Sequence, residues 1–281
     1  MHFDNDDPAT THAAQRLSDE ASRFRSRAAN DKRGPLKIIV SDFEFAYDMP
    51  SFRRYQRAED DPTEGWCRWP YHHICAAAWV MLTFRPGFDH PEISHIAAMT
   101  SDPFSEQTMV EAYLSAVFAD PDAALYSWGG EQKDWPVIGR NAMESGIQLP
   151  HQLTDMRPHA PLRVDLCNST SGQARCTHLP EYAYATGIPT KPTPSKLVGD
   201  AVIRGRWPEV EEQVCADLLT TSIIAARHMI AFGLCDADIG KTERAIADAF
   251  AKARPNSAFF ANAPKRLAEE RALPMSAKMA S

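Results

Sequence analysis

A short apolar segment that ends in two carboxylates separated by one residue is the feature that most constrains this chain. Leu36–Val40 is predicted to be a strand, and Asp42 and Glu44 follow it. Because side chains alternate along a strand, both carboxylates are expected on one face, with Phe43 and Phe45 on the other. Two carboxylates this close repel each other unless a cation lies between them, and hard oxygen ligands suit Mg²⁺ or Mn²⁺. The alternative is a solvated strand end without metal.

Length and composition indicate a soluble globular protein with one main core. The chain has 281 residues, of which 44% are hydrophobic and 24% are charged. We expect a flexible N-terminal segment (1–34), a core domain (35–235) and a C-terminal helix and tail (236–281). The net charge of -7 argues against a protein that coats nucleic acid nonspecifically, because such binding needs many basic side chains. It does not exclude an enzyme that holds only a strand end.

Cysteine usage and the absence of apolar segments predict the compartment. The six cysteines form no Cys-X-X-Cys pair, which disfavours a structural zinc site. The N-terminus is polar, and no stretch approaches the roughly twenty apolar residues that span a bilayer. We therefore expect reduced thiols, no membrane partner and a cytoplasmic location.

The order of predicted elements indicates a mixed α/β fold. A Pro- and charge-rich loop (49–63) follows the first strand, and the next elements are two antiparallel strands, a helix, a strand and a second helix. Their predicted bounds are Ile74–Phe84, Glu92–Met99, Ser105 to Pro121, Ala123–Trp128 and Asp134–Ser145. This βββαβα order is that of a ribonuclease H-like mixed sheet flanked by helices, although several mixed α/β folds share it.

Two later carboxylates extend the acidic set. Asp134 follows Trp128-Gly129-Gly130 at the start of a predicted helix, where it could cap the helix or face a metal ion. Asp217 lies on or beside the apolar stripe of a long helix that begins near Trp207. An unpaired carboxylate there would be costly, and a cation shared with Asp42 and Glu44 would account for it.

The spacing of these residues resembles a known family. Asp42-Phe-Glu44, Gly-Gly-X-X-X-Asp134-X-Pro136 and Asp217 on a late helix are similar to the DEDD, or DnaQ-like, 3′-to-5′ exonucleases of the ribonuclease H-like superfamily. The similarity is strongest to free-standing bacterial proteins related to the proofreading domain of family B DNA polymerases. Three further segments resemble the same family, and the resemblance covers roughly residues 36 to 230: Arg163–Leu166, Leu179–Lys191 and Gly199–Val202.

The resemblance implies two-metal hydrolysis of phosphodiester bonds at single-stranded DNA or RNA 3′ ends, with release of nucleoside 5′-monophosphates. Asp42 would bridge two Mg²⁺ or Mn²⁺ ions, Glu44 and Asp217 would hold one of them, and Asp134 would hold the other through water. It also implies substrate contacts along the strand end and the glycine turn, namely Phe43, Phe45, Trp128, Gly129, Gly130 and Lys191.

One catalytic position departs from the family. A Tyr four residues before the last Asp, or a His five before it, normally orients the attacking water, whereas this chain has Gln213 and Glu212 there. An amide cannot act as a base, but it can position a water. The second hypothesis is therefore a catalytically impaired nucleic-acid or partner-binding protein that keeps the fold. A third is a structural α/β protein whose acids are surface groups.

Several other side chains have two interpretations. Aromatic groups near the second strand could stack on unpaired bases or pack in the core: Phe52, Trp66, Trp69, His72 and His73. A local basic surface could hold the nucleic-acid backbone or be solvated: Lys191, Lys196, Arg204 and Arg206. Asp165 and Asp200 could each support the site or cap a turn. The two tails could contact a protein partner.

Overall fold

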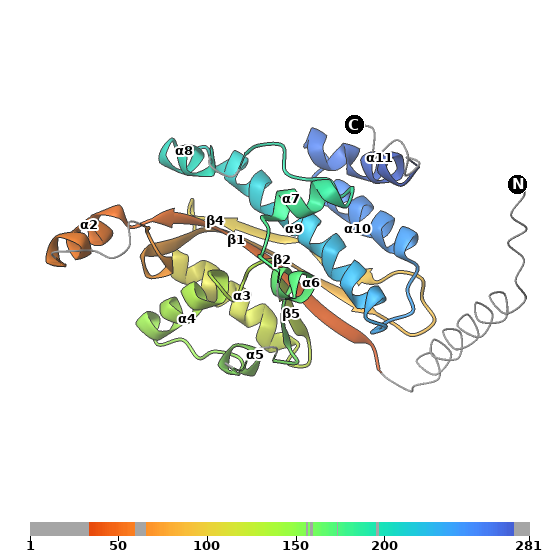
Figure 1. The fold of residues 1–281 in the computed structure, drawn as a ribbon, viewed down its shortest axis with the longest axis horizontal. Helices are drawn as coiled ribbons and strands as arrows, with labels where there is room; N and C mark the ends of the chain where they lie inside the picture. The colour runs from red at the N-terminus through yellow and green to blue at the C-terminus, as the bar shows by residue number, and fades with distance from the viewer. Residues whose placement is uncertain are drawn as a thin grey trace, which may run out of the picture.

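The apolar segment and the carboxylates after it belong to one long strand, β1 (Leu36–Tyr47), at the centre of the sheet. This computed structural model describes residues 34–59, 66–155, 157, 160–172, 174–194 and 197–272. The predicted N-terminal segment 1–34 therefore lies almost wholly outside the described residues. Helices cover both faces of the sheet (Figure 1).

The sheet is mixed and has the order β3-β2-β1-β5-β6, with β4 also paired to β2. β2 runs antiparallel to β1, whereas β5 is parallel to β1 and β6 is parallel to β5. The bounds are His72–Phe84 for β2, Glu92–Ile93 for β3, Ala97–Thr100 for β4, Ala124–Ser127 for β5 and Arg163–Asp165 for β6. This arrangement confirms the predicted ribonuclease H-like topology.

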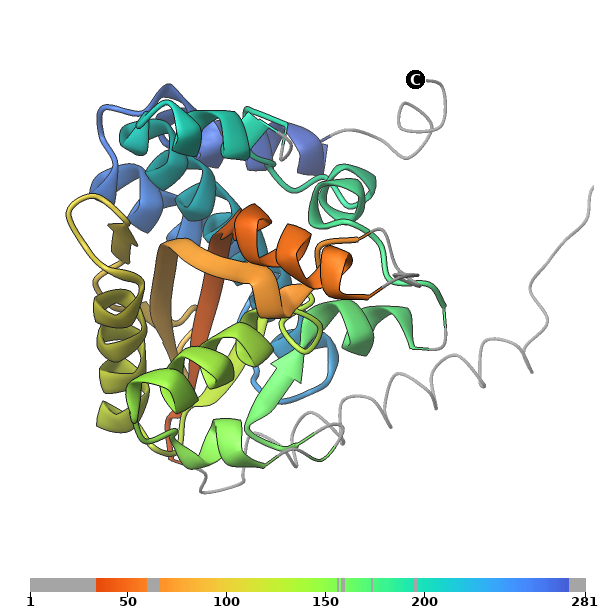
Figure 2. The same ribbon diagram turned by 90° about the vertical axis from the view of Figure 1, so that its left-hand side faces the viewer.

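The helices form one layer on each face of the sheet. α3 (Glu106–Ala119) and α4 (Asp134–Ser145) cover one face, and α9 (Trp207–Ala231) crosses the other (Figures 1 and 2). The remaining helices are α2 (Met49–Ala58), η1 (Trp69–Tyr71), α5 (His151–Thr154), α6 (Leu166–Ser171), α7 (Leu179–Ala185), α8 (Val198–Ile203), α10 (Ile239–Ala253) and α11 (Ala258–Ala272). β1 contributes to both cores, because Ile38 packs with the α9 layer and Ile39 with the α3 layer.

The helix α9 is long and apolar enough to cross a membrane by length and composition, with a mean hydropathy of 1.3 over its most apolar window. The sequence expectation that no stretch approaches this limit was therefore wrong for this helix. The fold buries 83% of that window, which is typical of a core helix. α10 packs against α9 and α11 packs against α10, and their Phe250 and Phe260 belong to the same core.

Three local predictions need correction. The expected loop after β1 contains α2, because Asp48 caps the Ser51 N–H and Pro50 is acceptable in a first helical turn. The return strand is split into β3 and β4, and between them the Ser94 hydroxyl accepts the Met81 N–H of β2. The expected C-terminal tail contains α11. This helix contains Pro264, and burial of Phe259 and Phe260 stabilises it.

The turn between β5 and α4 sets the position of Asp134. Gly129 has a φ of +74°, a conformation that side chains disfavour. Gly130 is tightly enclosed, since a Cβ there would lie 1.9 Å from Ser127 Oγ and 3.1 Å from a Trp135 ring carbon. The chain can therefore approach α4 this closely only with glycine at this position.

Gly130→Ala is expected to lower the free energy of unfolding by about 1–3 kcal/mol through overpacking. Gly139→Ala in the neighbouring helix α4 is the matched control, because a Cβ there meets nothing within 4 Å. That control should be neutral or more stable by up to about 1 kcal/mol. Urea unfolding measures both values. Equal stability of the two variants would contradict the close approach at Gly130.

Candidate metal centre

Three carboxylates from two distant parts of the sequence meet beside β1. Asp42 and Glu44 extend from the strand, and Asp217 comes from the middle of α9. One oxygen from each residue lies within 4.8 Å of the others. Phe43 and Phe45 are buried in the opposite core with α3, so the predicted alternation along β1 is confirmed. The group therefore offers a set of hard oxygen ligands on one face of the sheet.

The acidic cluster carries charge that its surroundings disfavour. The pKa of Asp42 is raised well above its ordinary value by burial, and then by the charges of Asp217, Glu44 and Asp134. Burial also raises the pKa of Asp217 to about 6, and the charge of Glu44 adds to this effect. A cation at this position would remove both the repulsion and the need to hold protons.

Lys191 already supplies one positive charge to the cluster. Its ammonium group donates a hydrogen bond to Asp217 and lies 3.5 Å from Glu44 Oε1, with only 6% of the side chain exposed. Burial opposes protonation of this amine, but the charges of Asp217 and Glu44 outweigh it and raise the pKa of Lys191. Lys191 was expected to contact substrate, and that expectation stays a prediction. Its ion pairs were not predicted, because they depend on a long-range approach of the segment after α7.

Asp134 lies beside the three-carboxylate group without joining it. It occupies the first turn of α4 and is 5% exposed, while Lys133 takes the N-cap position without a side-chain cap. The capping interpretation of Asp134 is therefore wrong. Burial raises the pKa of Asp134 to about 7; Lys133 opposes this shift, and the charges of Asp165 and Glu44 add to it. Its predicted link to a second ion through water stays a prediction.

Asp165 fixes the backbone that leads to Asp134. Its carboxylate accepts the N–H groups of Gly129 at 2.9 Å and Glu131 at 3.1 Å. It also accepts the Cys167 N–H and so caps α6. Both interpretations of Asp165 therefore apply, because one buried carboxylate caps a helix and holds the glycine turn.

The predicted substrate contacts of the aromatic residues stay predictions, but the structure gives each ring a packing partner. Phe43 packs edge-on against Tyr113 at 5.2 Å, and the Lys133 ammonium lies 4.4 Å from the centre of the Phe45 ring. Trp128 is partly exposed and donates its indole N–H to Thr177 at 3.1 Å. Trp128 is thus the most accessible ring of the three.

Gln213 lies one helical turn before Asp217 and is 4% exposed. Its Oε1 atom is buried and accepts no hydrogen bond within the described chain. The side chain lines a cavity of about 80 Å³ between α8 and α9, together with the ionic side chains of Asp200 and Arg206. Such a polar cavity has room for a water molecule.

Glu212 and the arginines of the expected basic surface each have a polar partner within the protein. Glu212 accepts a hydrogen bond from Ser257, which directly precedes α11. The Glu212 side chain therefore points toward the start of α11 and not toward Asp217. Arg204 and Arg206 both pair with Asp200. Lys196 lies outside the described residues. The expected basic surface is therefore largely neutralised in the part of the chain that the structure describes.

No protein-family profile and no curated protein matches this chain. Among solved structures, the chain is similar to the family B DNA polymerase from the hyperthermophilic archaeon Pyrobaculum calidifontis, with 14% identity, a TM-score of 0.49 and coverage of 78% of this chain and 29% of that one. It is also similar to exonuclease I, with 11% identity, a TM-score of 0.35 and coverage of 70% and 41%. The chain spans less than half of either protein, and its fold assignment rests on the strand order.

Mn²⁺ is expected to raise the melting temperature, and more strongly at pH 8 than at pH 5.5. In the metal-free fold, the pKa values of Asp134 and Asp217 are raised from 3.8 to about 7 and about 6. Groups with raised pKa values stabilise the fold when protonated, and that stability is lost as pH rises through the folded pKa. Mn²⁺ competes with these protons, so its effect grows over the same range.

Thermal unfolding with and without Mn²⁺ at both pH values tests this linkage, and at about 100-fold excess over Kd the expected gain is about 2.7 kcal/mol. Asp42→Asn should abolish the shift, whereas Glu92→Gln, at an exposed ion pair, should keep it. A shift that survives in Asp42→Asn, or that is equal at both pH values, would contradict the assignment.

Proposed function

We propose that this chain is a metal-dependent 3′-to-5′ exonuclease that hydrolyses single-stranded nucleic-acid ends. The observation that carries this proposal is the convergence of Asp42, Glu44 and Asp217 within 4.8 Å beside the central strand. Burial and mutual repulsion raise the pKa values of Asp42 and Asp217, so a fold that keeps them together favours an added cation. This combination is typical of a site that uses a metal rather than of a solvated sheet edge.

The donor set fits two divalent ions of the Mg²⁺ or Mn²⁺ type, since every candidate ligand is a carboxylate oxygen. Asp42, Glu44 and Asp217 would hold one ion, and Asp42 with Asp134 would hold the other. When bound, such ions supply an activated water and stabilise charge on the leaving 3′ oxygen. The product expected from this chemistry is a nucleoside 5′-monophosphate.

The protein groups around the cluster would position the substrate. Lys191 is the buried cation nearest the carboxylates, and it would hold a phosphate oxygen once a metal takes over its ion pairs. In the Gly129–Gly130 turn, Gly129 has open space beside it and would let the terminal nucleotide approach the backbone closely. Trp128 offers a partly exposed ring beside this turn. Phe43 and Phe45 would hold β1 in place through the core on the opposite face of the sheet.

Gln213 would orient a water molecule without removing its proton, because a neutral amide is not a base at physiological pH. Its buried Oε1 atom has no hydrogen-bond partner among the described residues, which supports this role. The same residue favours a second function, a nucleic-acid-binding protein that keeps the fold without turnover. We therefore expect slow hydrolysis from the first function and binding alone from the second.

Wild-type protein with Mn²⁺ or Mg²⁺ is expected to shorten a 5′-labelled single strand from its 3′ end. Asp42→Asn, Glu44→Gln and a chelator should each reduce cleavage to background, because each removes the metal. Arg244→Gln, which changes an exposed ion pair on α10, should leave the rate unchanged. A cleavage ladder that persists in Asp42→Asn would assign the activity to a contaminant and contradict the proposal.

The same assay with Gln213→Tyr separates the two functions. A gain of about tenfold or more in the cleavage rate would identify the amide as the reason for slow turnover. Binding of the strand without cleavage by either protein would instead favour the binding function.

A further inference from the structure

The helix α2 presents three arginines on one face and carries no carboxylate of its own. Arg53, Arg54 and Arg57 are all exposed. Their spacing places them within about 100° of one another around the helix axis. Like charges three and four residues apart repel each other on a helix surface. This face is therefore a local concentration of positive charge that the helix itself does not neutralise.

These arginines differ from most others in the described part of the protein. Arg85, Arg163, Arg227 and Arg254 each pair with a carboxylate, as do further arginines on α8, α9 and α10. Within the same residues, Arg53 and Arg57 form no ion pair, and Arg54 contacts only Ser51 Oγ at 3.5 Å. Arg53, Arg54 and Arg57 are thus three neighbouring arginines without an ion pair among the described residues of a chain whose net charge is -7.

The helix α2 lies near the end of β1 that carries the acidic cluster. The strand continues from Glu44 to Tyr47 and passes through Asp48 directly into α2, a span on the order of 13 Å. Figure 1 shows α2 projecting beyond that end of the sheet, and Figure 2 faces it from the same end. A polymer bound at the cluster could therefore continue onto α2.

Exposed aromatic rings lie on α2 and in the segments that precede and follow it in the sequence. Tyr47 is 56% exposed, Tyr55 is 41% exposed and Trp66 is 79% exposed. Aromatic rings beside basic side chains hold single-stranded nucleic acids, because bases stack on the rings while the cations contact phosphates. A protein partner with an acidic surface would pair with the arginines, but its carboxylates would not stack on the exposed rings as bases do.

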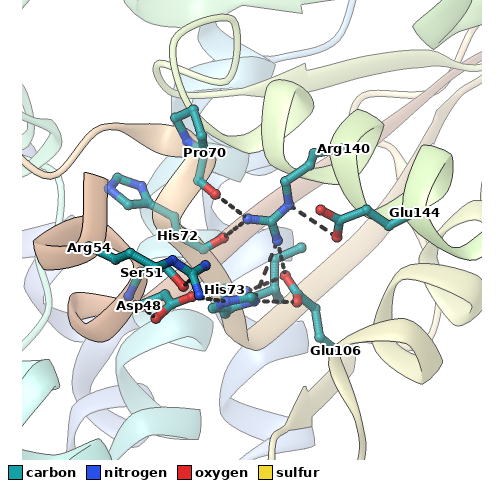
Figure 3. A network of polar contacts seen from close by, with 10 residues as sticks. Asp48, Ser51, Arg54, Pro70, His72, His73, Glu106, Arg140 and Glu144 are labelled. Carbon is teal, nitrogen blue, oxygen red and sulfur yellow. Dashed lines mark hydrogen bonds and ion pairs between the residues drawn. The ribbon is translucent and has the colours of Figure 1, made fainter. Parts of the chain in front are cut away.

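A polar network fixes the base of α2 to the elements that form the site (Figure 3). Asp48 caps α2 and lies 3.8 Å from His73 Nε2, while His73 Nδ1 is 2.8 Å from Glu106 of α3. Arg140 of α4 donates to Glu106 at 3.1 Å and to the Pro70 carbonyl at 2.8 Å. Because α4 also carries Asp134, the arginine face is held in a defined position relative to the acidic residues.

We propose that α2 is a docking surface for single-stranded nucleic acid, in which Arg53, Arg54 and Arg57 contact the phosphates behind the 3′ end and Tyr47 or Tyr55 stacks on a base. This inference rests on the proposed function and adds a binding site outside the acidic cluster. It places the strand along β1, from α2 toward the carboxylates. Both DNA and RNA offer the required phosphates and bases.

The test is binding of fluorescent oligothymidine and oligouridine to the full chain in EDTA, where cleavage cannot occur. The variant is the triple substitution Arg53→Gln, Arg54→Gln and Arg57→Gln. We expect a loss of about tenfold or more in affinity for both strands. The slope of log affinity against log salt concentration should become shallower by about two, because three phosphate contacts disappear. A loss for only one of the strands would assign the surface to that nucleic acid.

The matched control removes three exposed positive charges from α10 and α11 through Arg244→Gln, Lys252→Gln and Lys265→Gln. It should keep wild-type affinity, and circular dichroism should show that both triple variants fold. Equal affinity of the α2 variant and wild type would overturn the docking surface while leaving the exonuclease proposal intact. Binding that depends on α2, without any cleavage in Mn²⁺, would support the surface and overturn the exonuclease. A wild type that binds neither strand would overturn the surface.

Discussion

The repulsion among the carboxylates of Asp42 and Glu44, which are half-buried, and of Asp217, which is buried, is the constraint on which the site depends. Asp42 and Glu44 are fixed by the strand, and Asp217 is fixed by a core helix, so none of them can move away without disturbing the fold. The positive charge of Lys191 partly offsets this repulsion, because its ammonium contacts Asp217 and lies near Glu44. One ammonium cannot balance the whole group, as the raised pKa values of Asp42 and Asp217 indicate. Binding of a further cation at the site would therefore reduce the remaining repulsion.

The surrounding architecture holds this unfavourable arrangement in place. β1 lies between an antiparallel and a parallel neighbour, so its side chains have fixed directions on both faces. Asp165 accepts two backbone N–H groups from the glycine turn and thereby sets the approach to Asp134. The network of Asp48, Glu106 and Arg140 extends the same rigid frame to α2. Polar contacts of this kind cost little stability when each partner is satisfied, and they position charged groups accurately.

Sequence reasoning was strongest where the information is local. Alternation along a strand placed Asp42 and Glu44 on one face, and helical periodicity placed Asp217 on the inner side of a long helix; both were confirmed. It failed where a local signal has two meanings, since segments rich in proline and charge predicted a loop where α2 lies and a tail where α11 lies. It also missed the pairing of Lys191 with Asp217, because residues that meet through the tertiary fold leave no periodic pattern.

The most direct test of this account is a crystal structure of the protein soaked in Mn²⁺ at pH 8, with anomalous scattering recorded to locate the metal. The account predicts an anomalous peak among the carboxylates of Asp42, Glu44 and Asp217, with the Lys191 ammonium displaced from Asp217. The absence of an anomalous peak at saturating Mn²⁺, with Lys191 still hydrogen-bonded to Asp217, would contradict the metal assignment. In that case the lysine would be the permanent counter-ion of the cluster.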